Sequence, residues 1–124
     1  MNRRLVTMLS LVWLAGSIFF LPRPAWSASA KDNYRTYCAQ CHGLKGDGQG
    51  VNIRDMSVQP RNHTDGEYMS QRSDADLAKT DREGGLAIDK SVLMPPWGDI
   101  LSPAEIRDMV QYLRTLCHCR YNAQ

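Results

Sequence analysis

Apolar residues are distributed along the chain in two different ways. A mostly apolar run occupies residues 5–21, whereas residues 31–40 and 103–117 carry apolar side chains three or four positions apart, as on one face of an α-helix. Between the two periodic stretches, residues 43–64 are polar and rich in glycine, which favours loops. The pattern predicts a helix near each end of the folded part, with irregular chain between them.

The stretch after Leu101 has the clearest helix signal. Ser102 is a good N-cap, Pro103 suits the first helical position, and Glu105 completes a capping box. Apolar residues then follow at helical spacing at Ile106, Met109, Val110, Tyr112, Leu113, Leu116 and Cys117. We expect this helix to cross the helix over 31–40. With a helical turn at 68–72 and a helix over 77–82 that ends at Gly84-Gly85, the chain is predicted to be all-α, with three to four short helices.

The apolar run at the start has the features of a secretory signal peptide. Arg3 and Arg4 precede it, and small residues follow it, with cleavage expected after Ser27 or Ala30. Residues 1–30 are therefore predicted to be the signal peptide and residues 31–124 a single domain, exported to the periplasm. The alternative is an uncleaved membrane anchor, but the run is at the short end of the roughly 17–25 apolar residues that a spanning helix needs.

Removal of the signal peptide would change the charge of the protein. The whole chain has 15 basic and 13 acidic residues, for a net charge of +2. Residues 1–30 contain three of the basic residues and none of the acidic ones, so residues 31–124 have 12 against 13, a net charge of −1. The basicity of the full chain is thus no evidence for nucleic-acid binding, and no nucleic-acid partner is expected.

The segment Cys38-Ala39-Gln40-Cys41-His42 carries the most specific chemistry in the sequence. In an exported protein, two cysteines three apart followed by histidine predict covalent attachment of one haem c, with His42 as an axial ligand of the iron. A redox-active thiol pair would need a βαβ context, and a zinc site would need a second ligand pair at similar spacing. Neither is found, and a simple disulfide is the remaining alternative.

Met94 is the predicted second axial ligand. It stands in the stretch Met94-Pro95-Pro96-Trp97-Gly98, where two prolines stiffen the loop, and a thioether suits haem iron. Trp97 could cover the haem edge, and Pro60 could offer its carbonyl to the outer ring nitrogen of His42. The rival ligands are Met56, Met69, Met109, His63 and His118. We expect the three methionines to be core or surface residues and the two histidines to face solvent.

Taken together, these motifs resemble those of class I c-type cytochromes with a single haem, including small bacterial periplasmic cytochromes and haem subunits of terminal oxidases. The resemblance covers about residues 34–116 and rests on Tyr34, Cys38-x-x-Cys41-His42-Gly43, Gly46-Asp47-Gly48, Met94-Pro95-x-Trp97, Leu101-Ser102-x-x-Glu105-Ile106 and Tyr112-Leu113-Arg114. It implies an all-helical fold, His42 and Met94 as axial ligands, and electron transfer between larger redox proteins.

Cys117-His118-Cys119 departs from that pattern. A bond between the two cysteines requires the helix to end there, because residues two apart on a helix point in different directions. Other interpretations are a disulfide-linked dimer through Cys117 or Cys119, a pair of free thiols, or a soft-metal site that includes His118.

The sequence therefore predicts a periplasmic electron carrier that is not an enzyme. Its partners would be redox proteins, including membrane-bound respiratory complexes. The alternatives are an electron-entry haem subunit of a membrane oxidase or reductase, a haem sensor or peroxidase-like protein in which Met94 leaves the iron, and a metal- or thiol-handling protein centred on Cys117 and Cys119.

Overall fold

In a computed structural model, the described part of the chain, residues 27–123, is helical and contains no strands. Its elements are α1 (Ala30–Asn33), the π-helix η1 (Tyr34–Cys38), α2 (Ala39–His42), α3 (Gly66–Ser70), α4 (Asp74–Glu83), the 3₁₀-helix η2 (Gly85–Ile88) and α5 (Pro103–Cys117). The all-α prediction is confirmed. The apolar run at residues 5–21, and with it most of the predicted signal peptide, lies outside the described residues. No helix within residues 27–123 has both the length and the apolar character needed to cross a membrane.

The first three elements form one continuous helical segment, longer at both ends than the predicted 31–40. Ser29 caps its start by accepting a hydrogen bond from the Asp32 N–H. The middle turn is wider than an α-helical turn, and such π-turns often occur at functional sites. The segment ends at Gly43, whose φ of +82° is easily adopted only by glycine.

The C-terminal helix α5 begins as predicted. The Ser102 side chain accepts from the Glu105 N–H while the Glu105 carboxylate accepts from the Ser102 N–H, which completes the capping box. The helix ends at Cys117, because His118 adopts a left-handed conformation with φ of +51°.

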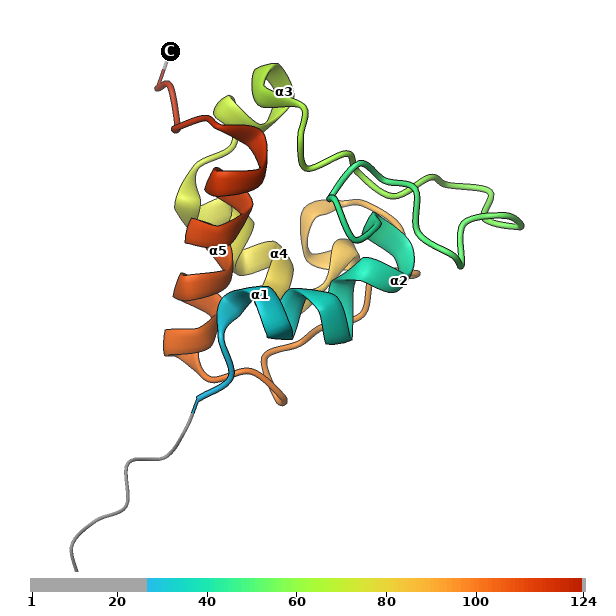
Figure 1. Ribbon diagram of the computed structural model, residues 1–124, viewed down its shortest axis with the longest axis horizontal. Coiled ribbons are helices and arrows are strands. Elements are labelled where there is room, and N and C mark those ends of the chain that lie inside the picture. The colour runs from blue at the N-terminus through green and yellow to red at the C-terminus, as the bar shows by residue number, and fades with distance from the viewer. Residues whose placement is uncertain (1–26, 124) are drawn as a thin grey trace, which may run out of the picture.

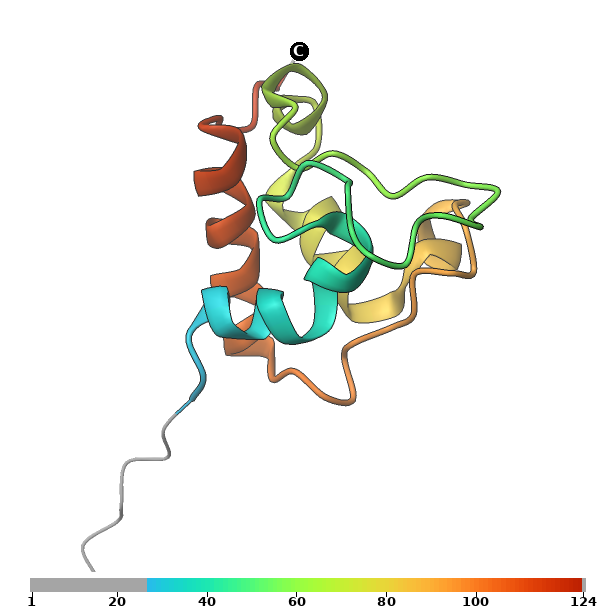
Figure 2. The same ribbon diagram turned by 45° about the vertical axis from the view of Figure 1, so that its right-hand side comes forward.

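The terminal helical segments cross, as predicted. α1 contacts α5 near its start, where Asn33 donates to the Glu105 carboxylate at 3.4 Å, and α4 also packs against α5 (Figures 1 and 2). The buried apolar residues of these elements form one cluster: Tyr34, Ala39, Met69, Leu101, Ile106, Met109, Leu113 and Cys117. This core occupies only the side of the molecule where the helices meet, and a large cavity opens between α2, α4 and the long loops.

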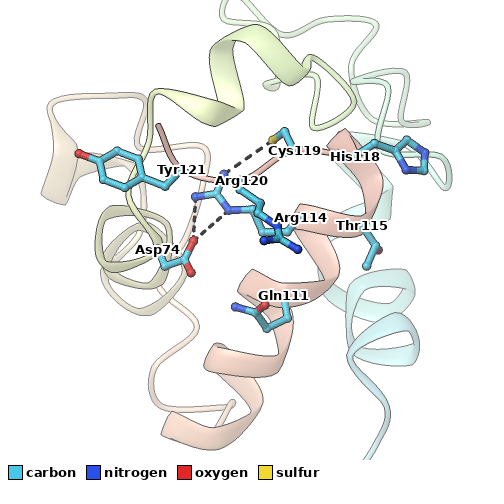
Figure 3. A pocket seen from close by; sticks show the side chains of 8 residues that line it. All are labelled: Asp74, Gln111, Arg114, Thr115, His118, Cys119, Arg120 and Tyr121. Atoms are coloured by element: carbon cyan, nitrogen blue, oxygen red, sulfur yellow. Dashed lines mark hydrogen bonds and ion pairs between the residues drawn. The ribbon is translucent and has the colours of Figure 1, made fainter. Parts of the chain in front are cut away.

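Arg114 joins α5 to the segment between α3 and α4. Its guanidinium donates to the carbonyl oxygens of Met69 at 2.7 Å and Arg72 at 2.6 Å, and to Asp74 Oδ1 at 2.8 and 2.9 Å. Figure 3 shows the two contacts with Asp74 at the edge of a pocket near the end of α5, where Cys119 Sγ lies 3.8 Å from the same guanidinium. Arg114 is thus a buried structural cation that fixes where α3 ends and α4 begins.

Candidate functional site

All six predicted site residues line one cavity of about 370 Å³. Cys38, Cys41 and His42 reach it from η1 and α2, and Met94 and Trp97 reach it from the loop before α5. Pro60 lines it from the long loop that follows the glycine-rich turn. Residues distant in the sequence are thus brought around a space lined mainly by apolar side chains, the usual character of a cofactor site.

Cys38 and Cys41 are both free thiols in the structure, three residues apart across the junction of η1 and α2. Burial, together with the nearby Asp81 and Cys41, raises the pKa of the Cys38 thiol to about 12. This thiol is therefore neutral at ordinary pH and a poor metal ligand or nucleophile for redox exchange. Its surroundings favour a neutral thioether more than a thiolate.

His42 is held with one ring nitrogen engaged and the other left for a ligand bond. Its Nδ1 lies 2.9 Å from the carbonyl oxygen of Arg61, and because a carbonyl only accepts, Nδ1 carries the proton. Burial lowers the pKa of His42 and this hydrogen bond raises it, with burial the larger effect. Nε2 of the neutral imidazole thus keeps its lone pair, as a metal ligand requires. The prediction that Pro60 supplies the carbonyl is wrong by one residue, since the loop turns the next carbonyl toward the ring.

The glycine-rich turn closes over the end of α2. Backbone N–H groups of Gly48, Gly50 and Asn52 donate to the carbonyls of His42, Cys41 and Gln40 at 2.8–3.1 Å. These carbonyls would otherwise lack partners at the helix end. A Cβ on Gly50 would stand 2.5 Å from the Cys41 carbonyl group, so the turn can approach this closely only with glycine.

His63 is a member of the site that sequence reasoning missed. Its ring stacks on that of His42, with centroids 4.2 Å apart and planes 15° from parallel, and its Nδ1 lies 3.1 Å from the Tyr34 hydroxyl. The backbone N–H of His63 donates to the Gly46 carbonyl, and this bond fixes the loop that carries His63 to the glycine-rich turn. The prediction that His63 faces solvent is wrong, whereas His118 is exposed as expected. Burial, with His42 and Arg61 nearby, lowers the pKa of His63 well below its usual value.

The Met94 loop is seated on the end of α4 by two adjacent glycines. The Gly85 N–H donates to the Met94 carbonyl at 2.9 Å, and a Cβ on Gly84 would stand 2.8 Å from that oxygen. Trp97 N–H donates to the Asp81 carbonyl at 3.0 Å, so one end of the loop is anchored to η2 and the other to α4. The Trp97 ring also packs against Tyr37, with centroids 5.2 Å apart. Gly84-Gly85 therefore ends the helix, as predicted, and also positions the methionine loop.

The three rival methionines also border the cavity but differ in burial. Met69 and Met109 are both 1% exposed and belong to the core, and Met56 is half-buried on the long loop. The Met94 carbonyl itself is bonded to Gly85, whereas the Met56 carbonyl accepts a bond from the Gln59 side chain of its own loop. This placement agrees with the expectation that the three are core or surface residues.

Three basic side chains line the cavity, and two of them lie together on one part of its wall. Arg61 and Arg72 flank the Tyr68 ring, with their guanidinium carbons 3.8 and 4.8 Å from its centroid, and Lys90 also lines the cavity. Cation–π contact holds both guanidinium groups beside the opening. A cofactor that carries carboxylates would find favourable charge here.

Cys117 and Cys119 form a disulfide within the chain. This pairing became possible because α5 ends at Cys117 and His118 turns the chain back. The free-thiol, soft-metal and disulfide-linked dimer interpretations are therefore wrong, because both sulfurs are used in this bond. Within residues 27–123, no group of three or more histidine, cysteine or acidic residues could hold a metal ion.

The side chains that surround the cavity are suited to a covalently bound haem. Two free cysteines, a histidine with its outer nitrogen fixed, an anchored methionine loop and a basic wall surround one apolar space. Each is a type of group that such a cofactor uses.

Comparisons with known proteins agree with this fit. Residues 27–113 match the family model described as cytochrome C oxidase, cbb3-type, subunit III. The fold resembles the KustC0563 c-type cytochrome, with 23% identity, a TM-score of 0.57, and coverage of 72% of this chain and 98% of that one. It also resembles a chain of the Kuenenia stuttgartiensis reducing HAO-like protein complex Kustc0457/Kustc0458, with 30% identity, a TM-score of 0.58, and coverage of 73% of this chain and 42% of that one. No curated protein matches the sequence.

Proposed function

Because the chain belongs to the cbb3-type subunit III family of c-type cytochromes, we propose that it is an electron carrier with one haem c bound through Cys38 and Cys41. The observation that carries this proposal is the single cavity on which both free cysteines, His42 and Met94 converge. Members of this family are typically electron carriers rather than enzymes. Electron transfer requires no substrate site beyond this cavity.

When bound, the haem supplies an iron that exchanges one electron between its ferric and ferrous states. The protein's part is to hold the iron's ligands still, so that little rearrangement accompanies the exchange. His42 offers Nε2 while the Arg61 carbonyl fixes its ring, and the stacked ring of His63 limits its rotation. Met94 is the proposed second axial ligand, supported by the anchoring of its loop to Gly85 and Asp81. A thioether ligand in an apolar cavity favours the ferrous state and raises the potential.

Trp97, Pro60 and the basic wall complete the proposed cofactor site. Trp97 covers one side of the cavity beside Tyr37, and Pro60 packs on the side of the glycine-rich turn, where its carbonyl lies 3.0 Å from the point a Cβ on Gly48 would occupy. Arg61, Arg72 and Lys90 are proposed to meet the haem propionates.

We further propose that the chain is exported and works with redox proteins in the periplasm. The N-terminal pattern supports export, and cleavage after Ser27 would keep the Ser29 cap of α1, whereas cleavage after Ala30 would remove it. The match to a chain of a protein complex supports redox-protein partners. A second candidate function is electron entry into a membrane oxidase, which the description of the family favours. Co-purification of the tagged chain with a membrane oxidase would identify that second role.

The deciding experiment is the visible spectrum of the haem-loaded protein and of its Met94→Ala variant. We expect a ferric sulfur-to-iron charge-transfer band in the wild type that disappears in the variant, with slow or absent carbon monoxide binding by the ferrous wild type. Met56→Ala is the matched control, because Met56 is a methionine that lines the same cavity from another loop, and the variant should keep the band. A wild type without the band that binds carbon monoxide rapidly would contradict the ligation and favour the sensor or peroxidase-like alternative.

A further inference from the structure

Asp81 is a buried acidic residue inside the cavity. Its side chain is 7% exposed, and its Oδ2 is the one buried side-chain oxygen or nitrogen among residues 27–123 that has no hydrogen-bond partner. The backbone carbonyl of Asp81 has a structural role, because it accepts a hydrogen bond from the Trp97 N–H. The carboxyl group of Asp81 makes no such contact. A buried polar atom without a partner costs about 1–3 kcal/mol, so this group calls for an explanation.

The charges around Asp81 offer it no counter-ion. In the described chain the ion pairs are Arg82 with Glu83 and Arg114 with Asp74, and neither includes Asp81. The titratable groups that interact with it are Tyr34 and Cys38, both on η1 and both acidic in character. The other charged or titratable residues of the cavity come from η1, α2, α3, α4 and the connecting loops: Tyr37, Cys41, His42, Arg61, His63, Tyr68, Arg72, Asp76 and Lys90. None of these forms a hydrogen bond or ion pair with the carboxyl group.

Burial without a partner disfavours the charged form of a carboxyl group. It raises the pKa of Asp81 to about 7, so that the group changes charge near neutral pH. Thioether formation at Cys38 would remove the ionisable thiol beside it and leave burial as the cause. A carboxyl group in this state responds strongly to a nearby change of charge, because the low-dielectric cavity screens that change weakly.

We propose that Asp81 is a proton-binding site coupled to the electron that the haem carries. This inference rests on the proposed function. As the iron gains one electron from a donor protein, Asp81 takes up one proton from solvent and becomes neutral. As the iron loses the electron to an acceptor, the carboxyl releases the proton. The charge inside the cavity is then the same before and after transfer, and the protein carries a proton together with an electron.

The sign of the effect follows from electrostatics. Ferric iron has one more positive charge than ferrous iron, so it favours the carboxylate and gives Asp81 a lower pKa than ferrous iron does. Below both pKa values the group is protonated in both redox states, and the potential does not depend on pH. Between them one proton accompanies each electron, and each tenfold fall in proton concentration lowers the potential by up to about 59 mV. Above both values the potential is again constant, at its lower level.

The test is the midpoint potential of the haem-loaded full chain as a function of pH from 5 to 9. We expect the wild type to fall with a slope approaching that limit in a window around neutral pH. Asp81→Asn cannot take up the proton, so it should be flat through this window and stay near the low-pH level of the wild type. Glu83→Gln is the matched control, because Glu83 is an exposed carboxylate on the same helix that does not line the cavity, and it should follow the wild type.

Infrared difference spectra give a second readout, whose first part uses the wild type alone. Ferrous-minus-ferric spectra of the wild type near pH 7 should contain a positive band of a protonated carboxyl group, and Asp81→Asn should lack it. A wild-type potential that does not change with pH, or an Asp81→Asn variant that keeps the wild-type slope, would overturn the inference. In the second case the propionates carry the proton. A protein without covalent haem or without reversible reduction would instead overturn the proposed function.

Discussion

Arg114 allows the stability of the fold to be tested with numbers from its contacts. We consider Arg114→Met, which keeps the buried aliphatic part and removes the guanidinium. The variant loses the hydrogen bonds from this cation to the carbonyls of Met69 and Arg72. At about 1.5–3 kcal/mol each, their loss lowers the free energy of unfolding by about 3–6 kcal/mol. The variant no longer has to bury a cation that is only 9% exposed, and this offsets part of the cost. We therefore expect the free energy of unfolding to fall by about 3 kcal/mol.

The neighbouring ion pair provides the control. The Asp74 side chain is 55% exposed, so its attraction to Arg114 is screened by water, and Asp74→Asn should cost less than about 1 kcal/mol. Urea unfolding of the haem-loaded proteins, followed by far-ultraviolet circular dichroism, measures both changes, and the m-value should stay constant. In thermal unfolding, about 3 kcal/mol corresponds to about 12–24 °C for a domain of this size. Equal losses for the two variants would refute the reasoning, because the ion pair and not the carbonyl contacts would then supply the stability.

Two further predictions concern the surroundings of His42. His63→Ala removes the stacked ring, so we expect the ferric electron paramagnetic resonance g values to shift. His63→Phe keeps a ring against His42 and should keep the wild-type g values. Identical spectra for the wild type and both variants would exclude a positioning role. Gly50→Ala would force a Cβ into the Cys41 carbonyl and should cost about 1–3 kcal/mol or more, with less haem-loaded protein recovered. The exposed Gln49→Ala is its control, and an equal yield from both variants would contradict the close approach.

The sequence was informative where a single local pattern decides the structure. The capping box of Ser102 and Glu105 and the apolar spacing after it predicted α5 with its first residue, because both signals lie within one stretch. The attachment motif and the proline-stiffened Met94 likewise predicted which residues line the cavity. These predictions needed no knowledge of how distant segments pack.

The residues that were missed depend on contacts between distant segments. Whether Pro60 or Arg61 turns its carbonyl toward His42 depends on the register of a loop 19 residues away, which no local pattern sets. His63 reaches His42 only because its backbone is bonded to Gly46. Asp81 stands in a polar helix, and only the packed structure places its carboxyl group in the cavity. For such residues, composition and spacing carry no signal.

The bond between Cys117 and Cys119 also bears on how the protein matures. The chain has four cysteines, which could pair in three ways if all were joined in disulfides. A ring closed between residues only two apart has the shortest loop available, so it forms with the smallest loss of chain entropy. Once this ring is closed, Cys38 and Cys41 are the only thiols left in the chain. The end of the last helix thereby keeps two sulfurs from competing for oxidation with Cys38 and Cys41, which in the proposed function stay reduced until haem is attached.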